Sequence, residues 1–118
     1  MRFILLIYAN EADWETKSPA EKEAVMRDHA TLDADLQKAG KYGACDALQS
    51  TRTATSVRIR NGKTLVTDGP FAETKEQLGG YFLIEAKDRA EAIEIASRIP
   101  SAKWGSIEVR PVWSENGK

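Results

Sequence analysis

The chain has 118 residues, of which 42% are hydrophobic and 30% are charged, and its formal net charge is −1. This length predicts a single domain, and the composition is typical of a folded globular protein rather than a disordered one. A net charge this small, with no local cluster of Lys and Arg, argues against nucleic acid or an anionic membrane surface as a partner. The single cysteine, Cys45, excludes an internal disulfide and a cysteine-rich zinc site, so we expect a reducing, cytoplasmic setting.

The first half of the chain predicts a strand followed by a long helix. Residues 3–8 are continuously apolar, as in a central strand covered on both faces, and the run is far shorter than the roughly 20 residues of a membrane span. Ser18 followed by Pro19 is a strong helix start, and Gly40 is a typical helix end. Between them one helical stripe repeats at spacings of three and four residues: Val25, His29, Leu32, Leu36 and Ala39.

The remainder of the chain predicts five strands and one helix. Residues 44–49 form a weak strand, residues 55–60 and 63–67 flank the hairpin signal Asn61-Gly62, and residues 80–86 and 106–112 form two more strands. Asp88 caps a second helix that ends at Pro100. Its expected inner face consists of Ala92, Ile93, Ala96 and Ile99. We assign residues 1–113 to one domain and expect the polar tail 114–118 to be frayed.

This order of elements predicts an α+β, ferredoxin-like βαββαβ fold with an inserted β-hairpin. Both helices then cover one face of a single antiparallel sheet and leave the other face bare. In the first strand Ile4, Leu6 and Tyr8 alternate with equally apolar neighbours, so the bare face is apolar as well. Since such a surface is unfavourable in a small monomer, we expect a homodimer whose sheets face each other across a cleft.

The segment 67–80, with sequence TDGPFAETKEQLGG, connects the hairpin to the next strand. Asp68, Gly69 and Pro70 are turn-forming residues, and we expect Phe71 to anchor the loop in the core. Residues 72–77 are expected to form one or two helical turns. The alternatives are a loop that only turns the chain and a loop that also holds a ligand.

Three stretches carry a specific resemblance: VTDGPFAETKEQLGGYFLIEA, the preceding ATSVRIRNGK and the later IPSAKWGSIEVRPV. The sequence resembles the YCII-related DGPF-domain family of small bacterial proteins over nearly its whole length, least between residues 10 and 50. The resemblance implies a dimeric α+β barrel. It also implies either an enzyme with a His–Asp pair or an accessory partner of a sigma factor. The motif matches at Asp68, Gly69, Pro70, Phe71, Glu73, Thr74, Lys75 and Glu76.

His29 is the only histidine, and with Asp68 it forms our candidate catalytic pair. An imidazole is the natural acid–base group at neutral pH, and a carboxylate is needed to orient it. Asp33, four residues along the helix, is the alternative carboxylate. Against these roles stand a half-buried histidine satisfied by a carbonyl, and an aspartate that only shapes a turn.

Four further residues are candidate ligand contacts: Glu108, Arg110, Tyr81 and Lys75. Arg110 beside Glu108 on the bare face can clamp an anion or form a structural ion pair, and Lys75 can close over an anion or lie in solvent. Cys45 is interpreted as a small buried hydrophobe rather than a nucleophile. With one histidine and scattered carboxylates, neither a metal site nor a cofactor is predicted.

The sequence thus favours a cytoplasmic homodimer that binds a small polar or anionic molecule, with metal-free acid–base catalysis as the chemistry its residues support. The alternative is a protein-interaction module that recognises a partner such as a sigma factor through residues 67–76. A third alternative is a purely structural dimer whose loop braces the subunit interface.

Overall fold

A computed structural model describes residues 1–114. Its main sheet is antiparallel with strand order β2-β5-β1-β6, formed by β1 (Arg2–Ala9), β2 (Tyr42–Ala47), β5 (Gln77–Glu85) and β6 (Ser106–Pro111). The helices are α1 (Glu11–Glu15), α2 (Pro19–Lys38) and α3 (Arg89–Ser97). Short 3-10 helices, η1 (Thr51–Thr53) and η2 (Pro100–Lys103), follow β2 and α3. The α+β class is confirmed, and the strand order is consistent with the expected ferredoxin-like arrangement.

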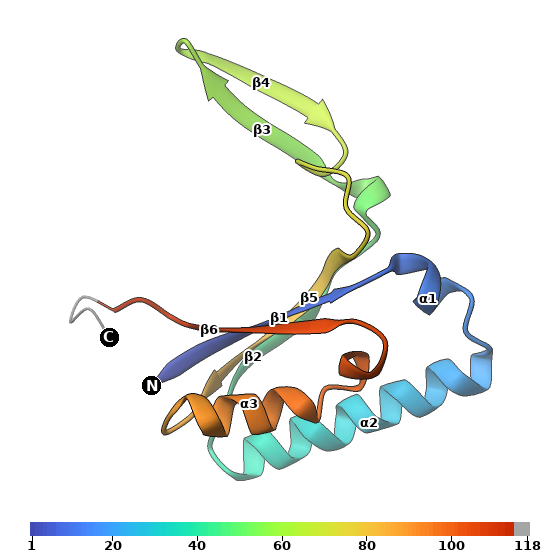
Figure 1. Ribbon diagram of the computed structural model, residues 1–118, viewed down its shortest axis with the longest axis vertical. Coiled ribbons are helices and arrows are strands. Elements are labelled where there is room, and N and C mark those ends of the chain that lie inside the picture. Colours follow the sequence, from blue (N-terminus) through green and yellow to red (C-terminus); the bar gives the residue numbers. More distant parts are fainter. Residues whose placement is uncertain (115–118) are drawn as a thin grey trace.

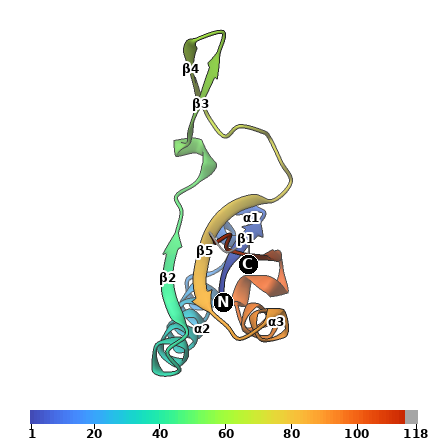
Figure 2. The ribbon, with the colours of Figure 1, turned by 90° about the vertical axis from the view of Figure 1, so that its left-hand side faces the viewer.

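The inserted hairpin forms a separate two-stranded sheet of β3 (Thr55–Arg60) and β4 (Lys63–Asp68). Asn61 and Gly62 adopt φ values of 53° and 74°, which the tight turn of such a hairpin requires. The hairpin, which we call the arm, stands clear of the rest of the chain in both ribbon views (Figure 1, Figure 2). The radius of gyration is accordingly 16.3 Å, against roughly 13–14 Å for a compact chain of this length.

Helices α2 and α3 pack on one face of the main sheet, and the arm rises on the other side (Figure 1). Alternate strand residues bury against the helices, and the largest fully buried side chains are Phe3, Phe82, Leu5, Leu32, Ile84 and Ile99. Of the stripe predicted for α2, Leu32 and Leu36 are buried. On α3 the buried isoleucine is Ile95, whereas Ile93 is half exposed, so that part of the predicted inner face is wrong.

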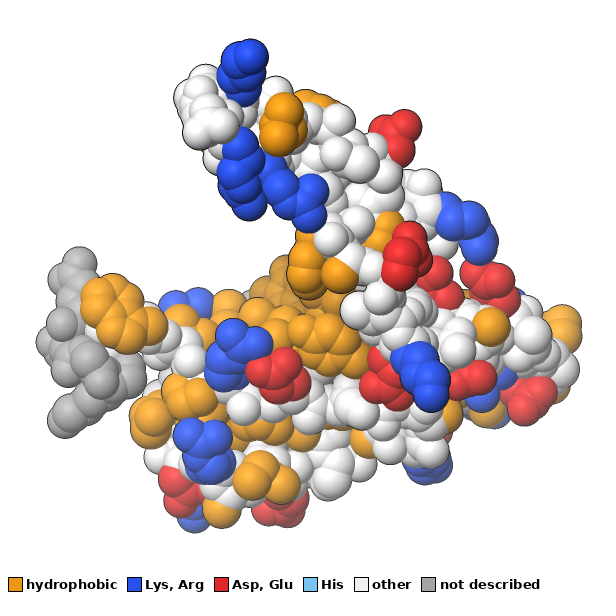
Figure 3. Space-filling model, turned by 45° about the horizontal axis from the view of Figure 1, so that its top comes forward, with side chains coloured by type: hydrophobic (Ala, Val, Ile, Leu, Met, Phe, Trp, Pro, Cys, Tyr) orange, Lys and Arg blue, Asp and Glu red, His pale blue; other side chains and the backbone are white. Residues whose placement is uncertain are grey.

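The face without helices is apolar, as the sequence predicts. The pairing register sets Tyr81, Leu6 and Glu108 side by side in one row, and Leu83, Ile4 and Arg110 in the next. Figure 3 shows hydrophobic side chains gathered over this surface, where the molecule is hollowed between the arm and the sheet. We call it the bare face.

Two expectations for the loop after the arm are wrong. Phe71 is 79% exposed rather than anchored in the core, because the arm stands away from the core. Residues 72–76 form bends and irregular backbone rather than helical turns, and β5 already begins at Gln77. Side-chain bonds to the backbone stabilise this shape: Thr74 Oγ1 donates to Glu76 O (2.6 Å) and Gln77 Nε2 donates to Thr74 O (2.5 Å).

Residues 115–118, most of the tail expected to fray, lie outside the described part of the chain. Within residues 1–114, no helix is both long and apolar enough to cross a bilayer.

Candidate functional site

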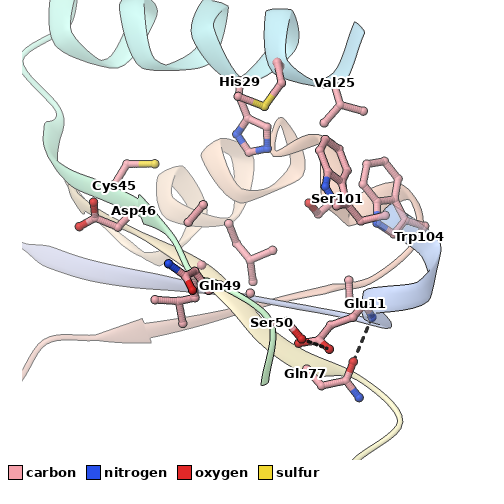
Figure 4. A pocket seen from close by; sticks show the side chains of 18 of the residues that line it. Glu11, Val25, His29, Cys45, Asp46, Gln49, Ser50, Gln77, Ser101 and Trp104 are labelled. Carbon is pink, nitrogen blue, oxygen red and sulfur yellow. Dashed lines mark hydrogen bonds between the residues drawn. The ribbon is translucent and has the colours of Figure 1, made fainter. Parts of the chain in front are cut away.

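A cavity of about 420 Å³ lies between α2 and one end of the sheet (Figure 4). Its wall is completed by α1, by η2 and by the segment that follows β2. The buried leucines of α2 lie in its C-terminal half, whereas Val25 and His29, in the preceding turns, line the cavity. A volume of this size falls within the range of pockets for small organic molecules.

His29 points from α2 into this cavity (Figure 4). Its ring stacks on Phe82 of β5, with centroids 6.0 Å apart and an angle of 5° between the planes. Burial lowers the pKa of His29 from its ordinary value of 6.5, against the opposing effect of the Asp33 and Asp28 charges. The imidazole is therefore mainly uncharged at neutral pH and can accept a proton or a hydrogen bond.

Asp33 lies one turn after His29 on the same helix and also lines the cavity. Its Oδ1 atom is buried and has no hydrogen-bond partner among the described residues. A buried carboxylate oxygen without a donor is costly in free energy, and most such oxygens in folded proteins are paired. Asp33 therefore lines the cavity with a carboxylate that is not fully paired within the described part of the chain.

Glu11 has a structural role at the mouth of the cavity. Its carboxylate accepts hydrogen bonds from Thr51 N (2.7 Å), Thr51 Oγ1 (3.1 Å) and Ser50 Oγ (3.2 Å). These bonds, the backbone one above all, lower the pKa of Glu11. The backbone N–H of Glu11 donates to Gln77 Oε1 (3.0 Å), so one residue ties α1 to η1 and to the start of β5.

Two tryptophans contribute to the wall, Trp14 from α1 and Trp104 after η2. The ammonium of Lys17 lies 4.1 Å from the centroid of the Trp104 ring, and that of Lys22 lies 5.6 Å from the centroid of the Trp14 ring. Such contacts are cation–π interactions. The rings are thus held in place by residues that do not line the cavity themselves.

Cys45 lines the cavity from β2. Burial, with smaller effects from the Asp33 and Asp46 charges, raises the pKa of its thiol to about 11. A thiol that stays protonated at neutral pH is a poor nucleophile. This supports the interpretation of Cys45 as a small buried hydrophobe.

The structure distributes the predicted site residues over four places. His29 is in the cavity, whereas Asp68 is exposed on β4 of the arm and does not line it, so the two are not brought together. Lys75 is exposed in the loop before β5. Tyr81, Glu108 and Arg110 share the bare face, on opposite sides of the apolar rows.

The three residues on the bare face already have partners. Tyr81 Oη donates to Asp46 Oδ2 (2.6 Å), and Arg110 donates to Glu108 Oε2 from Nε (2.9 Å) and Nη2 (2.6 Å). The cross-strand neighbours of Glu108 and Arg110 on β1 are Leu6 and Ile4, respectively. Within residues 1–114, no group of three or more His, Cys, Asp or Glu side chains could hold a metal ion.

Fold and cavity together define a small α+β protein with a ligand-sized pocket between a helix and its sheet. The profile of the YCII-related domain matches residues 1–116, and the chain therefore belongs to the YCII-related family. A curated relative from Rhizobium meliloti is 40% identical over 114 residues, which cover 95% of this chain and 92% of the relative. That relative is itself described as uncharacterized, so the family is established without an activity.

Proposed function

We propose that the protein binds a small molecule with a mainly apolar body in the cavity beneath α2, with His29 and Asp33 facing its polar group. The observation that carries the proposal is the unpartnered Oδ1 of Asp33 beside a half-buried, uncharged imidazole. The remaining wall is largely apolar and aromatic, with contributions from Val25, Trp14 and Trp104. An apolar pocket with a few convergent polar groups is the usual form of a ligand site.

The same pair supports metal-free acid–base chemistry. An uncharged imidazole can take a proton from a bound ligand, and a carboxylate one turn away stabilises the imidazolium that results. Asp33 is better placed for this role than Asp68, since it interacts electrostatically with His29 whereas Asp68 lies on the arm. Arg110 has no part in the proposal, because Glu108 already engages its guanidinium on the other face of the sheet.

A thermal-shift screen of a metabolite library tests the binding proposal. Val25→Trp should fill the cavity, whereas Ala30→Trp adds the same side chain at an exposed position of the same helix. We expect at least one compound to raise the melting temperature of the wild type and of Ala30→Trp but not of Val25→Trp. Equal stabilisation of all three proteins would place binding elsewhere and contradict the proposal.

We further propose that the protein is a homodimer in which the bare face is covered by a second copy. Ile4, Leu6 and Leu83 form a continuous half-exposed apolar surface there, flanked by the Glu108–Arg110 ion pair. A sheet that is apolar on both faces is stable in water only when both faces are covered. Because burial of these apolar rows away from water is favourable, we expect two sheets packed face to face.

Sedimentation equilibrium tests this assembly. Leu6→Glu places a charge in the middle of the bare face and should yield monomers. Ile93→Glu makes the same kind of change on the outer surface of α3 and should leave the dimer intact. A monomeric wild type, or a Leu6→Glu variant that still dimerises, would contradict the proposal.

The arm supports a second candidate function, recognition of a partner protein such as a sigma factor. Val57, Ile59 and Val66 share one face of the hairpin and are 61%, 66% and 64% exposed. Phe71 follows at the base of the arm, also exposed. In a pull-down, wild type should retain a partner that Phe71→Ser loses, while the dimer remains. Loss of the dimer in that variant would instead favour the arm as part of the subunit interface.

A further inference from the structure

The charged residues that line the cavity are all of one sign. Four acidic residues line it, Glu11, Glu15, Asp33 and Asp46, although the Asp46 side chain bonds Tyr81 on the bare face. Among the described residues of the lining, none is Lys or Arg. A carboxylate or phosphate ligand would therefore enter a site that repels its charge and offers no basic side chain to pair with it.

Three of the four carboxylates are already engaged. Glu11 accepts bonds from Thr51 and Ser50, as described above. Glu15 forms an ion pair with Arg52 (3.1 Å), and Asp46 accepts the Tyr81 hydroxyl (2.6 Å). Asp33 is different, since its buried Oδ1 has no donor among the described residues. Asp33 is thus the one of these four acidic residues whose carboxylate has neither a hydrogen bond nor an ion pair among the described residues.

The neighbours of Asp33 suit a positively charged group. His29, one turn earlier, presents a second acceptor in its uncharged form, so two acceptors converge on the same part of the cavity. The wall also includes the indoles of Trp14 and Trp104, whose rings already attract the ammonium groups of Lys22 and Lys17. Aromatic faces and a carboxylate together are a common environment for bound ammonium groups.

We propose that the cavity selects an organic cation, a protonated primary or secondary amine carried on an aromatic or aliphatic body. Its N–H groups donate to the Asp33 carboxylate and to the His29 imidazole, and its body packs against the tryptophans. This inference rests on the proposed binding function, and of the polar or anionic ligands expected from the sequence it disfavours the anionic ones. The shared chemistry is that of a monoamine, whatever its metabolic source.

Three probes of similar shape and different charge test the selectivity: 2-phenylethylamine, 2-phenylethanol and phenylacetate. Binding to the dimer is measured by isothermal titration calorimetry at neutral pH. Since a hydrogen bond to a charged group contributes more than a neutral one, we expect the amine to bind at least about tenfold more tightly than the alcohol. We expect phenylacetate to bind least.

Two variants locate the effect. Asp33→Asn should lower the affinity for the amine by about tenfold, the loss expected for one charged partner, and leave that for the alcohol unchanged. Glu23→Gln removes the same charge from an exposed position on the same helix that does not line the cavity, and it should leave both affinities unchanged. The urea midpoint of each variant is measured as well, to check that the variant folds as stably as the wild type.

The outcomes separate this inference from the proposed function. Equal affinities for the three probes, all abolished by Val25→Trp, would overturn the charge selectivity and leave the binding pocket standing. Tighter binding of phenylacetate would overturn the selectivity as well. Failure of all three probes to bind the wild type would overturn the selectivity, while the thermal-shift screen tests the pocket independently.

Discussion

The main sheet with its helices and the arm are built from similar strands, yet different interactions stabilise them. In the main sheet, Phe82 and Leu5 are fully buried between strands and helices. In the arm, Val57 and Ile59 are as apolar as core residues but remain mostly exposed. At the base of the arm, polar contacts join its two strands: Ser56 Oγ donates to Gly69 O (2.8 Å) and Gly69 N donates to Ala54 O (2.7 Å).

The two regions therefore owe their stability to different interactions. The main sheet contains its own hydrophobic core and is stable through it. An isolated two-stranded hairpin is only marginally stable in water, so the arm depends on its junction and on whatever covers its apolar face. Mutations of equal size should therefore have unequal effects in the two regions.

The largest expected effect comes from the core. Phe82→Ala removes a fully buried ring that also supports His29, and we expect it to lower the free energy of unfolding by about 3–5 kcal/mol. Val57→Ala in the arm should change it by less than about 0.5 kcal/mol. Urea denaturation at one fixed, low protein concentration measures both. A comparable loss in the two variants would show that the arm shares the core.

The next effect concerns the junction where β5 enters the main sheet. A Cβ atom at Gly80 would lie 2.8 Å from the backbone oxygen of Asp46, whereas one at Gly79 would meet nothing within 4 Å. We expect Gly80→Ala to cost about 1–3 kcal/mol, since the strand pairing must give way. Gly79→Ala, measured in parallel by urea denaturation, should be nearly neutral. If both substitutions were tolerated equally, the close approach of β2 to β5 would be wrong.

A smaller effect is expected at the tip of the arm. Gly62 has a φ of 74°, and an alanine in this left-handed conformation costs about 1–2 kcal/mol. Because the arm is separate, Gly62→Ala should speed amide hydrogen exchange in β3 and β4 and leave the urea midpoint of the main sheet unchanged. A lowered midpoint would mean that the two regions unfold together.

The smallest effect is the pH dependence that His29 gives to the main sheet. Its pKa is lowered by burial, so the unfolded chain takes up this proton more readily than the folded one. The His29 contribution to stability is therefore present above about pH 6.5 and lost as the pH falls through the folded-state pKa. Urea midpoints should show a decline between neutral and mildly acidic pH that is reduced in His29→Gln. Identical declines would assign the effect to other groups.

Strong local signals made much of the fold predictable. Ser18 caps α2 in the expected manner, with its Oγ accepting from Glu21 N (3.1 Å) and the Glu21 side chain accepting from Ser18 N (3.0 Å). Asn61-Gly62 forms the expected hairpin turn, because both residues tolerate positive φ. Helix α1 was missed, since five residues are too few to show a helical period, although Asn10 caps it through a bond from Ala12 N (2.9 Å).

The site was less predictable than the fold. The apolar stripe on α2 correctly predicted that His29 faces the sheet. Helical spacing alone identified Asp33 as a neighbouring carboxylate. Trp14 and Trp104 reach the same cavity from segments far apart in the sequence, and no periodic pattern links them. The error at Phe71 has a similar origin: an apolar side chain indicates burial only where a core lies within reach, and the arm carries it away from one.

The most direct test of the account uses the single histidine, whose imidazole gives one signal to follow by proton NMR. We predict that His29 titrates below its ordinary pKa of 6.5 and that adding 2-phenylethylamine shifts its resonance and its titration. Such a result would place an uncharged imidazole inside a working ligand pocket. If the His29 pKa were at or above 6.5 and did not change on addition of the amine, His29 would face solvent, and the proposed site would be wrong.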